Sequence, residues 1–579
     1  MTVKENLKMD YKQAYTRWLE SSKVESSLKA ELEVIKDEKE IEDRFYQNLA
    51  FGTGGLRGKM GAGSNRMNIH TIAKATQGLA NYLVSVKEKS SIAIAYDSRN
   101  MSKEFADTAA SVLTAAGIKV FLYEGLRPTP MLSFAVRHLG TDAGIVVTAS
   151  HNPKEYNGYK VYGNDGGQMT DEAANQVLAS IDAVDIFEDV KQMELKKAEN
   201  EGLLEYIGEA VDTVYYEAIQ TLTIRKQLIQ DKAKDMEIIY TPIHGSGNIP
   251  VRTILSKMGF ENVHVVQEQE HPDGNFPTAP YPNPEDKQVF ELAIEMAKDI
   301  SPDLIFGTDP DCDRIGVVVK EADGNYRVLT GNQVGTLLTD YILGARKELG
   351  LLTEKDVVIK TIVTSEMGRA VCASYGAVMM DVLTGFKYIG EKIKEFGETG
   401  SNNFVLGFEE SYGYLAGDFV RDKDAVIAAA LIAEMALYHK QEGKNLYEAL
   451  QDLFEKHGFY KEELVSITME GKDGQEKIAG ILTSLRENTP KEVAGVRIAR
   501  VEDYKLSKAY NLIEGTEEVI NLPTSNVMKF FLEDGKWFVV RPSGTEPKMK
   551  VYLSAIGTSE ADAEEKVAAF GEAVNALIH

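Results

Sequence analysis

Disulfide-forming residues are almost absent from this sequence. Its 579 residues include only two cysteines, Cys312 and Cys372. A secreted protein of this length usually carries more, because disulfides persist only in oxidising compartments. We therefore expect a cytoplasmic protein. The first residues, Met1–Asn6, agree with this expectation, since they lack the apolar core of a signal peptide.

Long apolar runs are lacking as well. The longest one in the helical part, Ala425–Ala433, is ended by Glu434 and is far too short to cross a bilayer. It is typical of a buried helix. We expect no membrane contact through this segment.

Positive charge is in short supply. Lysine and arginine total 64 against 89 aspartates and glutamates, which gives a net charge of −25. Nucleic acids and anionic lipid surfaces are repelled by such a field, so neither is expected as a partner. A small anionic substrate remains possible where basic side chains gather in a cleft. No feature of the sequence indicates an obligate protein partner.

What is present is the composition of an ordinary globular protein. Hydrophobic residues make up 43% and charged residues 26%, which argues against disorder. The length predicts roughly three to five domains. We expect a helical extension and four domains, with the boundaries 1–45, 46–205, 206–322, 323–455 and 456–579.

Strand-like and helix-like segments alternate along most of the chain. This alternation predicts α/β layers. A helix is expected from Ser102 to Ala116, ended by Gly117. Near the C-terminus, a turn at Asp534-Gly535 between two strand-like runs predicts a hairpin on a smaller α+β domain. The expected strands are Ile92–Tyr96, Lys119–Tyr123, Gly144–Thr148, Glu237–Thr241, Val263–Val266, Leu304–Gly307, Ile315–Lys320, Val357–Ile362, Phe404–Leu406, Val527–Leu532 and Trp537–Val540.

A serine loop follows one expected strand. Ser150 is next to His151, and Lys160 lies a few residues further on. A serine at a strand end with acid/base groups nearby could be a nucleophile. A serine hydrolase is disfavoured, because Thr148 and Asn152 take the glycine positions of the G-x-S-x-G motif. A simple polar turn explains this loop equally well.

An acidic loop carries the sharpest chemical signal. Asp309, Asp311 and Asp313 alternate directly after an expected strand. In extended chain they face one point, and three carboxylates repel one another unless a cation holds them. Oxygen ligands suit Mg²⁺ or Ca²⁺, but an EF-hand is excluded by Arg314 at its glycine position and Lys320 at its glutamate position. The loop therefore predicts Mg²⁺ with a phosphate partner, while a solvated acidic turn remains the alternative.

Four further loops offer groups for an anionic sugar. The glycine cluster Phe51–Gly58 matches neither common nucleotide-binding motif and presents Arg57. Near the C-terminus, Arg541 opens a loop of hydroxyls and backbone N–H groups that would suit a phosphate. The runs Gly407–Gly413 and Thr384–Lys387 offer acceptors for sugar hydroxyls and a cation for a phosphate. None of these four loops is specific on its own.

Taken in order, these segments resemble the α-D-phosphohexomutase superfamily along nearly the whole chain after residue 45. Within it, the chain is similar to the bacterial α-phosphoglucomutase group. The matching stretches are Thr148-Ala149-Ser150-His151-Asn152-Pro153, Asp309-Pro310-Asp311-Cys312-Asp313-Arg314, Gly407-Phe408-Glu409-Glu410-Ser411, Arg541-Pro542-Ser543-Gly544-Thr545 and His271-Pro272-Asp273-Gly274-Asn275-Phe276-Pro277.

The resemblance implies an architecture and an activity. It implies three related α/β domains and a smaller C-terminal α+β domain around a central cleft. The implied reaction interconverts glucose 1-phosphate and glucose 6-phosphate through a phosphoserine and a glucose 1,6-bisphosphate intermediate. The implied cofactors are Mg²⁺ and that bisphosphate. Sugar phosphates are the implied partners.

The resemblance also implies a role for each candidate site residue. The phosphorylated Ser150 would bind the metal together with Asp309, Asp311 and Asp313. Proton transfer is assigned to His151 and Lys160, and the phosphoryl group would be steadied by Arg57 and Arg314. The substrate-binding residues would be Lys387, Glu409, Ser411, Arg541, Ser543, Gly544 and Thr545.

One departure bears on the substrate. The phosphomannomutase/phosphoglucomutase branch has a Ser-Gly-His pattern after the sugar-binding glutamate, whereas this chain has Ser411-Tyr412-Gly413-Tyr414. The departure resembles the glucose-preferring branch. A phosphopentomutase or phosphomannomutase on the same scaffold remains the alternative, as does a catalytically silent relative.

Overall fold

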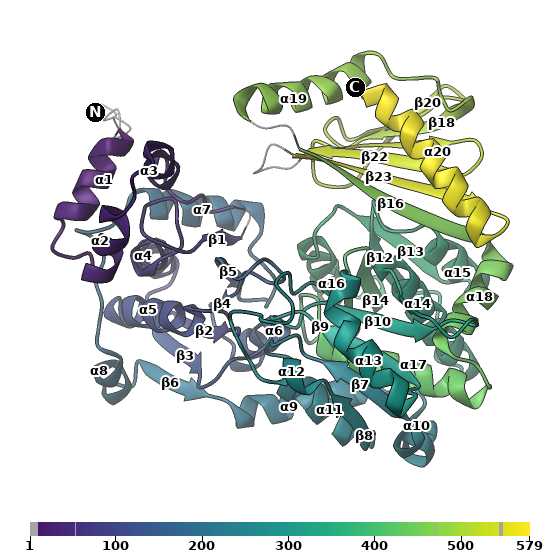
Figure 1. Cartoon of the computed structure of the whole chain (residues 1–579), viewed down its shortest axis with the longest axis horizontal. Helices are drawn as coiled ribbons and strands as arrows, with labels where there is room; N and C mark the ends of the chain where they lie inside the picture. The colour runs from purple at the N-terminus through teal and green to yellow at the C-terminus, as the bar shows by residue number, and fades with distance from the viewer. Residues whose placement is uncertain (1–9, 53, 469–470, 543–547, 579) are drawn as a thin grey trace. The chain divides into compact units, whose positions relative to one another are not determined.

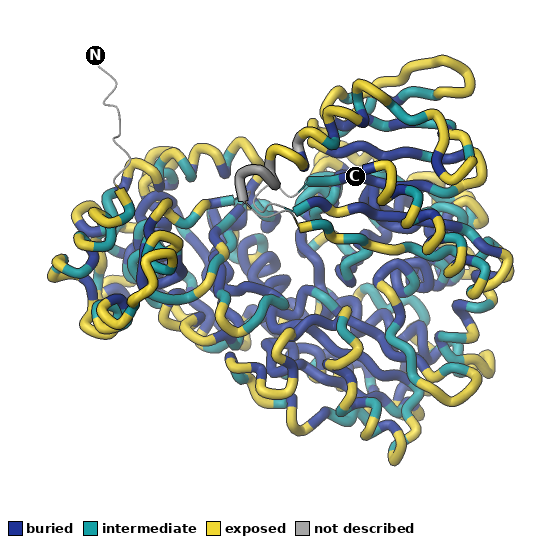
Figure 2. The backbone as a smooth tube through the Cα atoms, turned by 45° about the horizontal axis from the view of Figure 1, so that its top comes forward, coloured by how far each residue is buried: buried dark blue, intermediate teal, exposed yellow. Residues whose placement is uncertain are grey.

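The computed structural model describes residues 10–52, 54–468, 471–542 and 548–578. They form two compact units. The first holds the described residues up to Leu329 together with Ile389–Gly400 and Ser411–Gln441. The second holds Thr330–Tyr388, Ser401–Glu410 and the described residues from Glu442 onward. In each unit, buried backbone lies inside and exposed loops lie outside (Figure 2).

The first unit begins with three short helices, α1 (Tyr11–Glu20), α2 (Ser26–Glu33) and α3 (Glu38–Phe45). Their apolar residues recur at helical spacing, so one face of each helix is buried. Trp18, Leu32 and Phe45 form a small core of their own with Phe187. Arg44 donates hydrogen bonds to Glu31 and to the carbonyl of Ala62, which fixes the helices to the next segment.

A six-stranded sheet follows. Its order is β1-β5-β4-β2-β3-β6, with β4, β2, β3 and β6 parallel and β1 and β5 antiparallel to their neighbours. Its central strands are buried apolar runs, as expected for a parallel sheet covered on both faces. The strands are β1 (Gly55–Lys59), β2 (Ser91–Tyr96), β3 (Lys119–Tyr123), β4 (Ala143–Val147), β5 (Tyr156–Gly163) and β6 (Leu204–Ile207).

Five helices accompany this sheet. The helix predicted from Ser102 is confirmed and ends at Ala115, and Gly117 has the positive φ of +79° that permits the turn after it. The N-terminus of α6 reaches the acidic loop, which is described below. The helices are α4 (Ile69–Val86), α5 (Ser102–Ala115), α6 (Thr129–Leu139), α7 (Asp171–Asp182) and α8 (Leu195–Asn200).

A second sheet completes the first unit, in the order β11-β10-β9-β7-β8. Strands β7, β8 and β9 are parallel, and β10 and β11 are antiparallel to their neighbours. The strands are β7 (Glu237–Thr241), β8 (Asn262–Val265), β9 (Leu304–Thr308), β10 (Ile315–Lys320) and β11 (Tyr326–Val328). The helical segments are α9 (Glu209–Thr221), α10 (Lys226–Lys232), η1 (Ala233–Asp235), α11 (Asn248–Lys257), α12 (Gln267–Glu270), η2 (Lys287–Phe290) and α13 (Glu291–Ile300).

Three later elements return to the first unit: most of α16 (Lys387–Thr399), β15 (Gly413–Leu415) and α17 (Ala425–Gln441). The apolar run predicted to be a buried helix forms α17, whose residues are buried from Ala425 to Leu437. Within the described residues, no helix is both long enough and apolar enough to span a membrane.

The second unit contains a parallel sheet and an antiparallel one. The parallel order is β13-β12-β14, from β12 (Asp356–Thr361), β13 (Val378–Val382) and β14 (Asn403–Glu409). Its helices are α14 (Gly331–Glu348), α15 (Met367–Tyr375) and α18 (Leu446–His457).

The antiparallel sheet is C-terminal and has the order β16-β23-β22-β21-β18-β19-β20, with β17 paired to β18. Helix α20 (Glu560–Ile578) lies along one face of it (Figure 1). The predicted hairpin is confirmed, with Gly535 at φ +86° in its turn. The other elements are β16 (Phe459–Thr468), α19 (Gly471–Glu487), β17 (Glu492–Val493), β18 (Val496–Asp503), β19 (Lys508–Asn511), β20 (Thr516–Val519), β21 (Met528–Leu532), β22 (Trp537–Pro542) and β23 (Lys548–Gly557).

Candidate active site

Ser150 lies in a tight turn just beyond the carboxyl end of β4. It is buried and has φ +52°, a left-handed conformation that costs a non-glycine residue about 1–2 kcal/mol. Its amide donates to Thr148 Oγ1 at 2.8 Å, which helps to hold the turn. Its hydroxyl donates to Asp309 Oδ2 at 2.8 Å and lies 3.2 Å from His151 Nδ1. The serine loop and the acidic loop therefore meet within the first unit.

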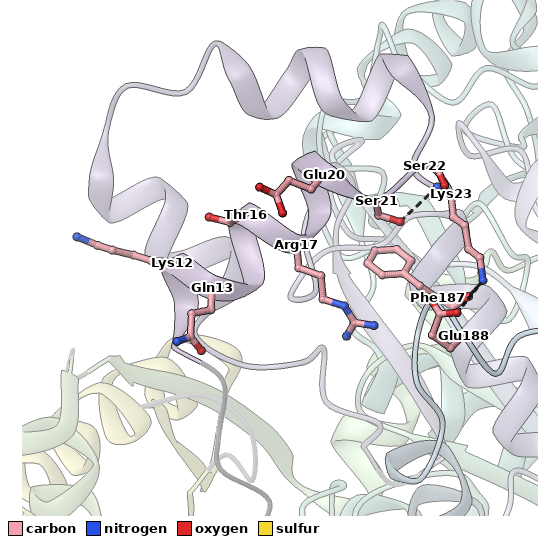
Figure 3. Close-up of a pocket in the computed structure, with 10 residues that line it drawn as sticks. All are labelled: Lys12, Gln13, Thr16, Arg17, Glu20, Ser21, Ser22, Lys23, Phe187 and Glu188. Atoms are coloured by element: carbon pink, nitrogen blue, oxygen red, sulfur yellow. Dashed lines mark hydrogen bonds and ion pairs between the residues drawn. The ribbon is translucent and has the colours of Figure 1, made fainter.

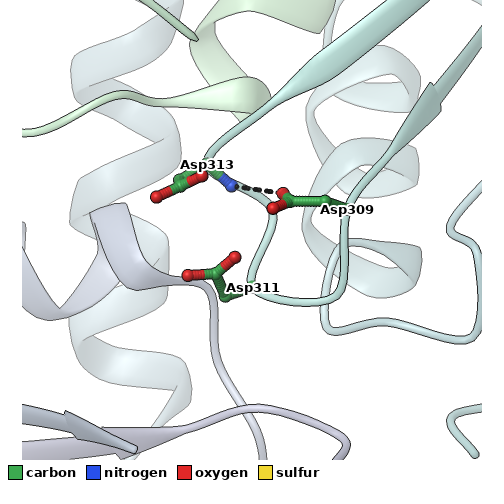
Figure 4. A group of neighbouring side chains, drawn as sticks. All are labelled: Asp309, Asp311 and Asp313. Carbon is green, nitrogen blue, oxygen red and sulfur yellow. Dashed lines mark hydrogen bonds between the residues drawn. The ribbon is translucent and has the colours of Figure 1, made fainter. Parts of the chain in front are cut away.

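The three aspartates of the acidic loop converge between β9 and β10 (Figure 4). All are buried, and one carboxylate oxygen from each lies within 4.8 Å of the others. We predicted that the aspartates face one point because they alternate along an extended chain. That geometry is wrong, because the loop is a turn. Asp309 Oδ1 instead accepts the amides of Asp313 and Arg314 at 3.1 and 3.0 Å, and Cys312 takes a left-handed φ of +50°.

Two lysines neutralise the trio. Lys160 comes from β5, and its Nζ lies 3.0 Å from Asp311 Oδ2 and 3.6 Å from Asp313 Oδ2. Lys423 Nζ lies 3.1 Å from Asp313 Oδ2. Thr129, at the start of α6, adds a hydrogen bond of 2.8 Å to Asp311. These contacts reduce the mutual repulsion of three carboxylates that share one buried space.

Burial and neighbouring charges give the three aspartates different pKa values. Burial raises the pKa of Asp309 well above its usual value, and the charges of Asp311 and Asp313 raise it further. Burial and Asp311 likewise raise the pKa of Asp313. Burial would also raise the pKa of Asp311, but the Lys160 ammonium and the hydrogen bonds with Asp309, Lys160 and Thr129 together outweigh it and hold that pKa below its usual value. Negative charge is therefore concentrated on Asp311.

The trio fits a hard divalent cation. Asp311 Oδ1 and Asp313 Oδ1 are buried and accept no hydrogen bond from the described residues. A buried acceptor left in this way costs about 1–3 kcal/mol, and more when it is charged. Oxygen-only ligands suit Mg²⁺ or Ca²⁺ rather than softer metals. An ion at this place would satisfy both oxygens.

His151 and Lys160, both near Ser150, differ in their pKa shifts and therefore in their protonation states. Burial and then Arg314 lower the pKa of His151 well below its usual value, so its imidazole is neutral at pH 7 and able to accept a proton. Burial also lowers the pKa of Lys160, but Asp311 and Asp313 outweigh it and raise that pKa overall. Lys160 is therefore an ammonium that donates.

The two arginines predicted to steady a phosphoryl group lie in the first unit. Arg57 is exposed on β1, with its Cα opposite Gly158 of β5. Arg314 follows the acidic loop and donates to Glu285 at 3.0 Å. Both carry positive charge close enough to lower the pKa of His151. The structure thus gathers the catalytic and metal candidates in one unit.

The predicted sugar-binding residues are split between the units. Ser411 belongs to the first, whereas Lys387 and Glu409 belong to the second. Glu409 Oε1 accepts the amide of Gly385 at 3.1 Å, which ties the Thr384–Lys387 loop to the end of β14. The Lys387 ammonium lies 4.8 Å from the ring centre of Tyr388.

The predicted phosphate loop is described only at its start. Arg541 lies at the end of β22, opposite Lys550 of β23. Ser543, Gly544 and Thr545 lie outside the described residues.

Sequence reasoning missed Lys423 and Thr129 as neighbours of the trio. Lys423 lies in the charged run Arg421-Asp422-Lys423-Asp424 directly before the apolar run of α17. Charged residues beside a fully buried helix are a signal for a paired buried ion. Thr129 is buried at the N-terminus of α6, and nothing in its local sequence indicates an acidic partner.

A separate pocket of about 630 Å³ lies at the N-terminal helices (Figure 3). Its cations already have partners, because Arg17 pairs with Asp185 and Lys23 with Glu188. None of the candidate site residues lines it. The lining residues are Lys12, Gln13, Thr16, Arg17, Glu20, Ser21, Ser22, Lys23, Phe187 and Glu188.

Four family models match this chain. They are phosphoglucomutase/phosphomannomutase α/β/α domain I at residues 48–186, domain II at 213–324, domain III at 330–457 and the C-terminal domain at 482–572. The predicted architecture of three α/β domains and a C-terminal α+β domain is confirmed by this order together with the sheets described above.

Curated relatives match most of the chain. A phosphoglucomutase of Staphylococcus haemolyticus is 40% identical over 515 residues, which cover 89% of this chain and 91% of the relative. A phosphoglucomutase of Staphylococcus epidermidis is 38% identical over 535 residues, covering 90% and 95%.

Solved structures share the fold. A putative phosphomannomutase from Thermus thermophilus has a TM-score of 0.67 at 22% identity and covers 92% of this chain and 99% of its own. An Aspergillus fumigatus N-acetylphosphoglucosamine mutase, solved with GlcNAc-6P and magnesium, has a TM-score of 0.50 at 15% identity and covers 92% and 97%. The four family models and the curated relatives make the chain a member of the phosphoglucomutase/phosphomannomutase family.

Proposed function

We propose that this protein is a phosphoglucomutase that interconverts glucose 1-phosphate and glucose 6-phosphate. The observation that carries the proposal is the hydrogen bond of 2.8 Å between the Ser150 hydroxyl and Asp309, within a buried acid trio. The staphylococcal relatives named phosphoglucomutase, at 37–40% identity, favour glucose over mannose or a pentose as the sugar.

Ser150 carries the phosphoryl group in this proposal. In the first half-reaction the Oγ–P bond breaks and a bond from phosphorus to the 6-oxygen of glucose 1-phosphate forms. The 6-hydroxyl gives up its proton, and the departing Oγ gains one to become the Ser150 hydroxyl. The product is glucose 1,6-bisphosphate, which turns over in the site. In the second half-reaction the O1–P bond breaks and the phosphoryl group returns to Oγ. The Ser150 hydroxyl gives up its proton, and O1 gains one. Glucose 6-phosphate leaves.

Side chains around Ser150 move the protons and place the charges. The neutral His151 imidazole accepts the hydroxyl proton, and the Lys160 ammonium donates one to the departing oxygen. Arg57 and Arg314 steady the equatorial oxygens of the phosphoryl group. Ser150 is buried, and exclusion of water from its turn would slow hydrolysis of the phosphoserine.

The phosphorylated Ser150, Asp309, Asp311 and Asp313 would hold Mg²⁺. When bound, the ion neutralises charge on phosphoryl oxygens during transfer. The two carboxylate oxygens of the trio that accept no hydrogen bond from the described part of the chain support this assignment.

The sugar and its second phosphate are assigned to residues further along the chain. Glu409 and Ser411 would accept hydrogen bonds from sugar hydroxyls, and Lys387 would contact the substrate. The non-reacting phosphate would be bound by Arg541, Ser543, Gly544 and Thr545. Binding of the non-reacting phosphate would orient the reacting hydroxyl for transfer, which lowers the barrier by positioning.

A coupled assay for glucose 6-phosphate tests the proposal. We expect turnover of glucose 1-phosphate that requires Mg²⁺ and is stimulated by trace glucose 1,6-bisphosphate. Ser150→Ala should lose nearly all turnover, whereas Ser180→Ala, at a half-buried serine of α7, should keep it. Full activity of Ser150→Ala would refute the scheme. A higher kcat/KM for mannose 1-phosphate or ribose 1-phosphate would reassign the substrate.

A further inference from the structure

Arg99 is enclosed by the serine loop. Its guanidinium, on the segment between β2 and α5, donates hydrogen bonds to four backbone carbonyls of that loop. Those of Pro153 and Tyr156 accept at 2.9 and 3.1 Å, and those of Ser150 and Asn152 accept from the same Nη2 nitrogen. The side chain is fully buried.

The four carbonyls explain why a cation is needed there. Their oxygens converge on one point, and converging dipoles of one sign repel unless a positive group lies between them. A guanidinium presents five donors in a rigid plane, whereas an ammonium has three donors around a point charge. The loop is therefore folded around Arg99.

Arg99 is itself held by Asp97 and packs against Phe276. Asp97 Oδ1 accepts the Arg99 amide at 2.9 Å, and Asp97 Oδ2 lies 3.5 Å from Arg99 Nε. The hydroxyl of Ser102 donates to Asp97 at 2.7 Å and so fixes that carboxylate. The guanidinium also lies 5.0 Å from the ring centre of Phe276. These contacts hold the Arg99 guanidinium in one position, against which the serine loop folds.

The contacts of Arg99 also bear on the position of Ser150 Oγ, the reacting atom. Ser150 has a strained left-handed backbone, and its own carbonyl is one of the four bound by Arg99. The same residue directs its hydroxyl to Asp309. We propose that Arg99 is a positioning residue for the mutase reaction, which acts by holding the Ser150 turn so that Oγ faces the acid trio. This inference rests on the proposed function and adds a residue to it.

Arg66 offers a matched control. It is also a buried arginine of the first unit, but it bonds Asp43 and the carbonyl of Asn65 instead of the serine loop. Loss of either arginine should lower stability. Only loss of Arg99 should disturb Ser150.

The experiment compares Arg99→Met, Arg99→Lys and Arg66→Met with the full-length wild type. We expect Arg99→Met to lower kcat by about 100-fold with KM for glucose 1-phosphate nearly unchanged, because small displacements of reacting groups have effects of that size. The kcat of Arg99→Lys should fall between those of the wild type and Arg99→Met, since lysine supplies three donors for four acceptors. Arg66→Met should keep the wild-type kcat.

Hydrogen–deuterium exchange of residues 148–158 supplies a readout that does not depend on activity. Exchange should be faster in Arg99→Met and unchanged in Arg66→Met. A kcat of Arg99→Met within about threefold of that of Arg66→Met, or unchanged exchange, overturns the inference. If Arg99→Met does not fold, Arg99→Lys decides by the same two criteria. If the wild type lacks mutase activity, the proposed function fails, and the exchange data alone still decide whether Arg99 holds the loop.

Discussion

The hydroxyl of Ser150 donates a 2.8 Å hydrogen bond to Asp309, although the two are 159 positions apart in the sequence. Ser150 follows a strand of the first sheet and Asp309 follows a strand of the second. Both lie beyond the carboxyl end of their strand, which is where α/β sheets collect ligands. The contact turns two separate sequence motifs into one site.

Removing the Lys160 ammonium should leave Asp311 as an uncompensated buried charge. We expect Lys160→Met to lower stability by about 3–5 kcal/mol, the usual cost of breaking a buried pair. It should also lower kcat by about 10²-fold or more, since a proton donor is lost. Urea unfolding and the coupled assay measure the two effects. Lys103→Met, which removes an exposed lysine paired with Asp107, should change neither by much.

The acid trio should bind Mg²⁺ in the absence of substrate. Chelation should abolish turnover, and added Mg²⁺ should restore it. At about 100 times its Kd, the ion should stabilise the protein by about 2.7 kcal/mol, visible as a rise in Tm. Asp311→Asn should remove most of that rise. An equal rise in the variant would show that the ion binds elsewhere.

Asp424 should give stability a specific pH dependence. Burial raises its pKa to about 7, against the hydrogen bonds that it accepts from Tyr215 and the amides of Val426 and Ile427. Between the unfolded value of 3.8 and about 7, the folded protein holds a proton that the unfolded chain has lost. Stability from this group is therefore greatest below pH 4 and falls as pH rises to about 7.

Asp424→Asn isolates this effect, because asparagine keeps the shape and the capping acceptor. From pH 5 to 7 the free energy of unfolding of the wild type should fall by about 2–3 kcal/mol relative to that of the variant, at about 1.4 kcal/mol per pH unit. The thermal midpoints of both proteins across this range measure the difference. A constant difference would mean that Asp424 is ionised throughout.

Gly158 should not tolerate a side chain. An added Cβ would lie 2.4 Å from the carbonyl oxygen of Thr148, two residues before Ser150. We expect Gly158→Ala to cost about 1–3 kcal/mol and to lower kcat, because the backbone of the serine turn must move. Gly397→Ala is the control, since its Cβ meets nothing within 4 Å and alanine favours its helix. Equal effects of the two substitutions would contradict the crowding at Gly158.

Strands that are continuous apolar runs were predictable from the sequence. The predicted Lys119–Tyr123, Glu237–Thr241 and Ile315–Lys320 are the observed β3, β7 and β10. Strand β5, which carries Lys160, was not predicted, because its Asn157-Gly158 pair is typical of a turn. That pair is accommodated by close packing of Gly158 against the backbone of Thr148, directly after β4, and of Leu56 in β1.

The acidic loop shows the other limit of sequence reasoning. The residue types predicted a metal site, but alternation in an extended strand was the wrong geometry. The carboxylates converge because Asp309 binds the amides that follow it in a turn. Lys423 was missed for a different reason: the charged run before α17 signals a buried ion pair, but tertiary packing decides that its partner is Asp313.

The most direct test follows the phosphate itself. The enzyme would first be phosphorylated with glucose 1,6-bisphosphate and separated from free sugar. It would then be mixed with one equivalent of glucose 1-phosphate. At successive times, mass spectrometry would measure the mass of the peptide containing Ser150, and the sugar phosphates would be assayed in parallel. We predict that the phosphate on this peptide passes to sugar and returns at a rate at least equal to kcat. A phosphate that stays on Ser150 while glucose 6-phosphate accumulates would contradict transfer through this serine.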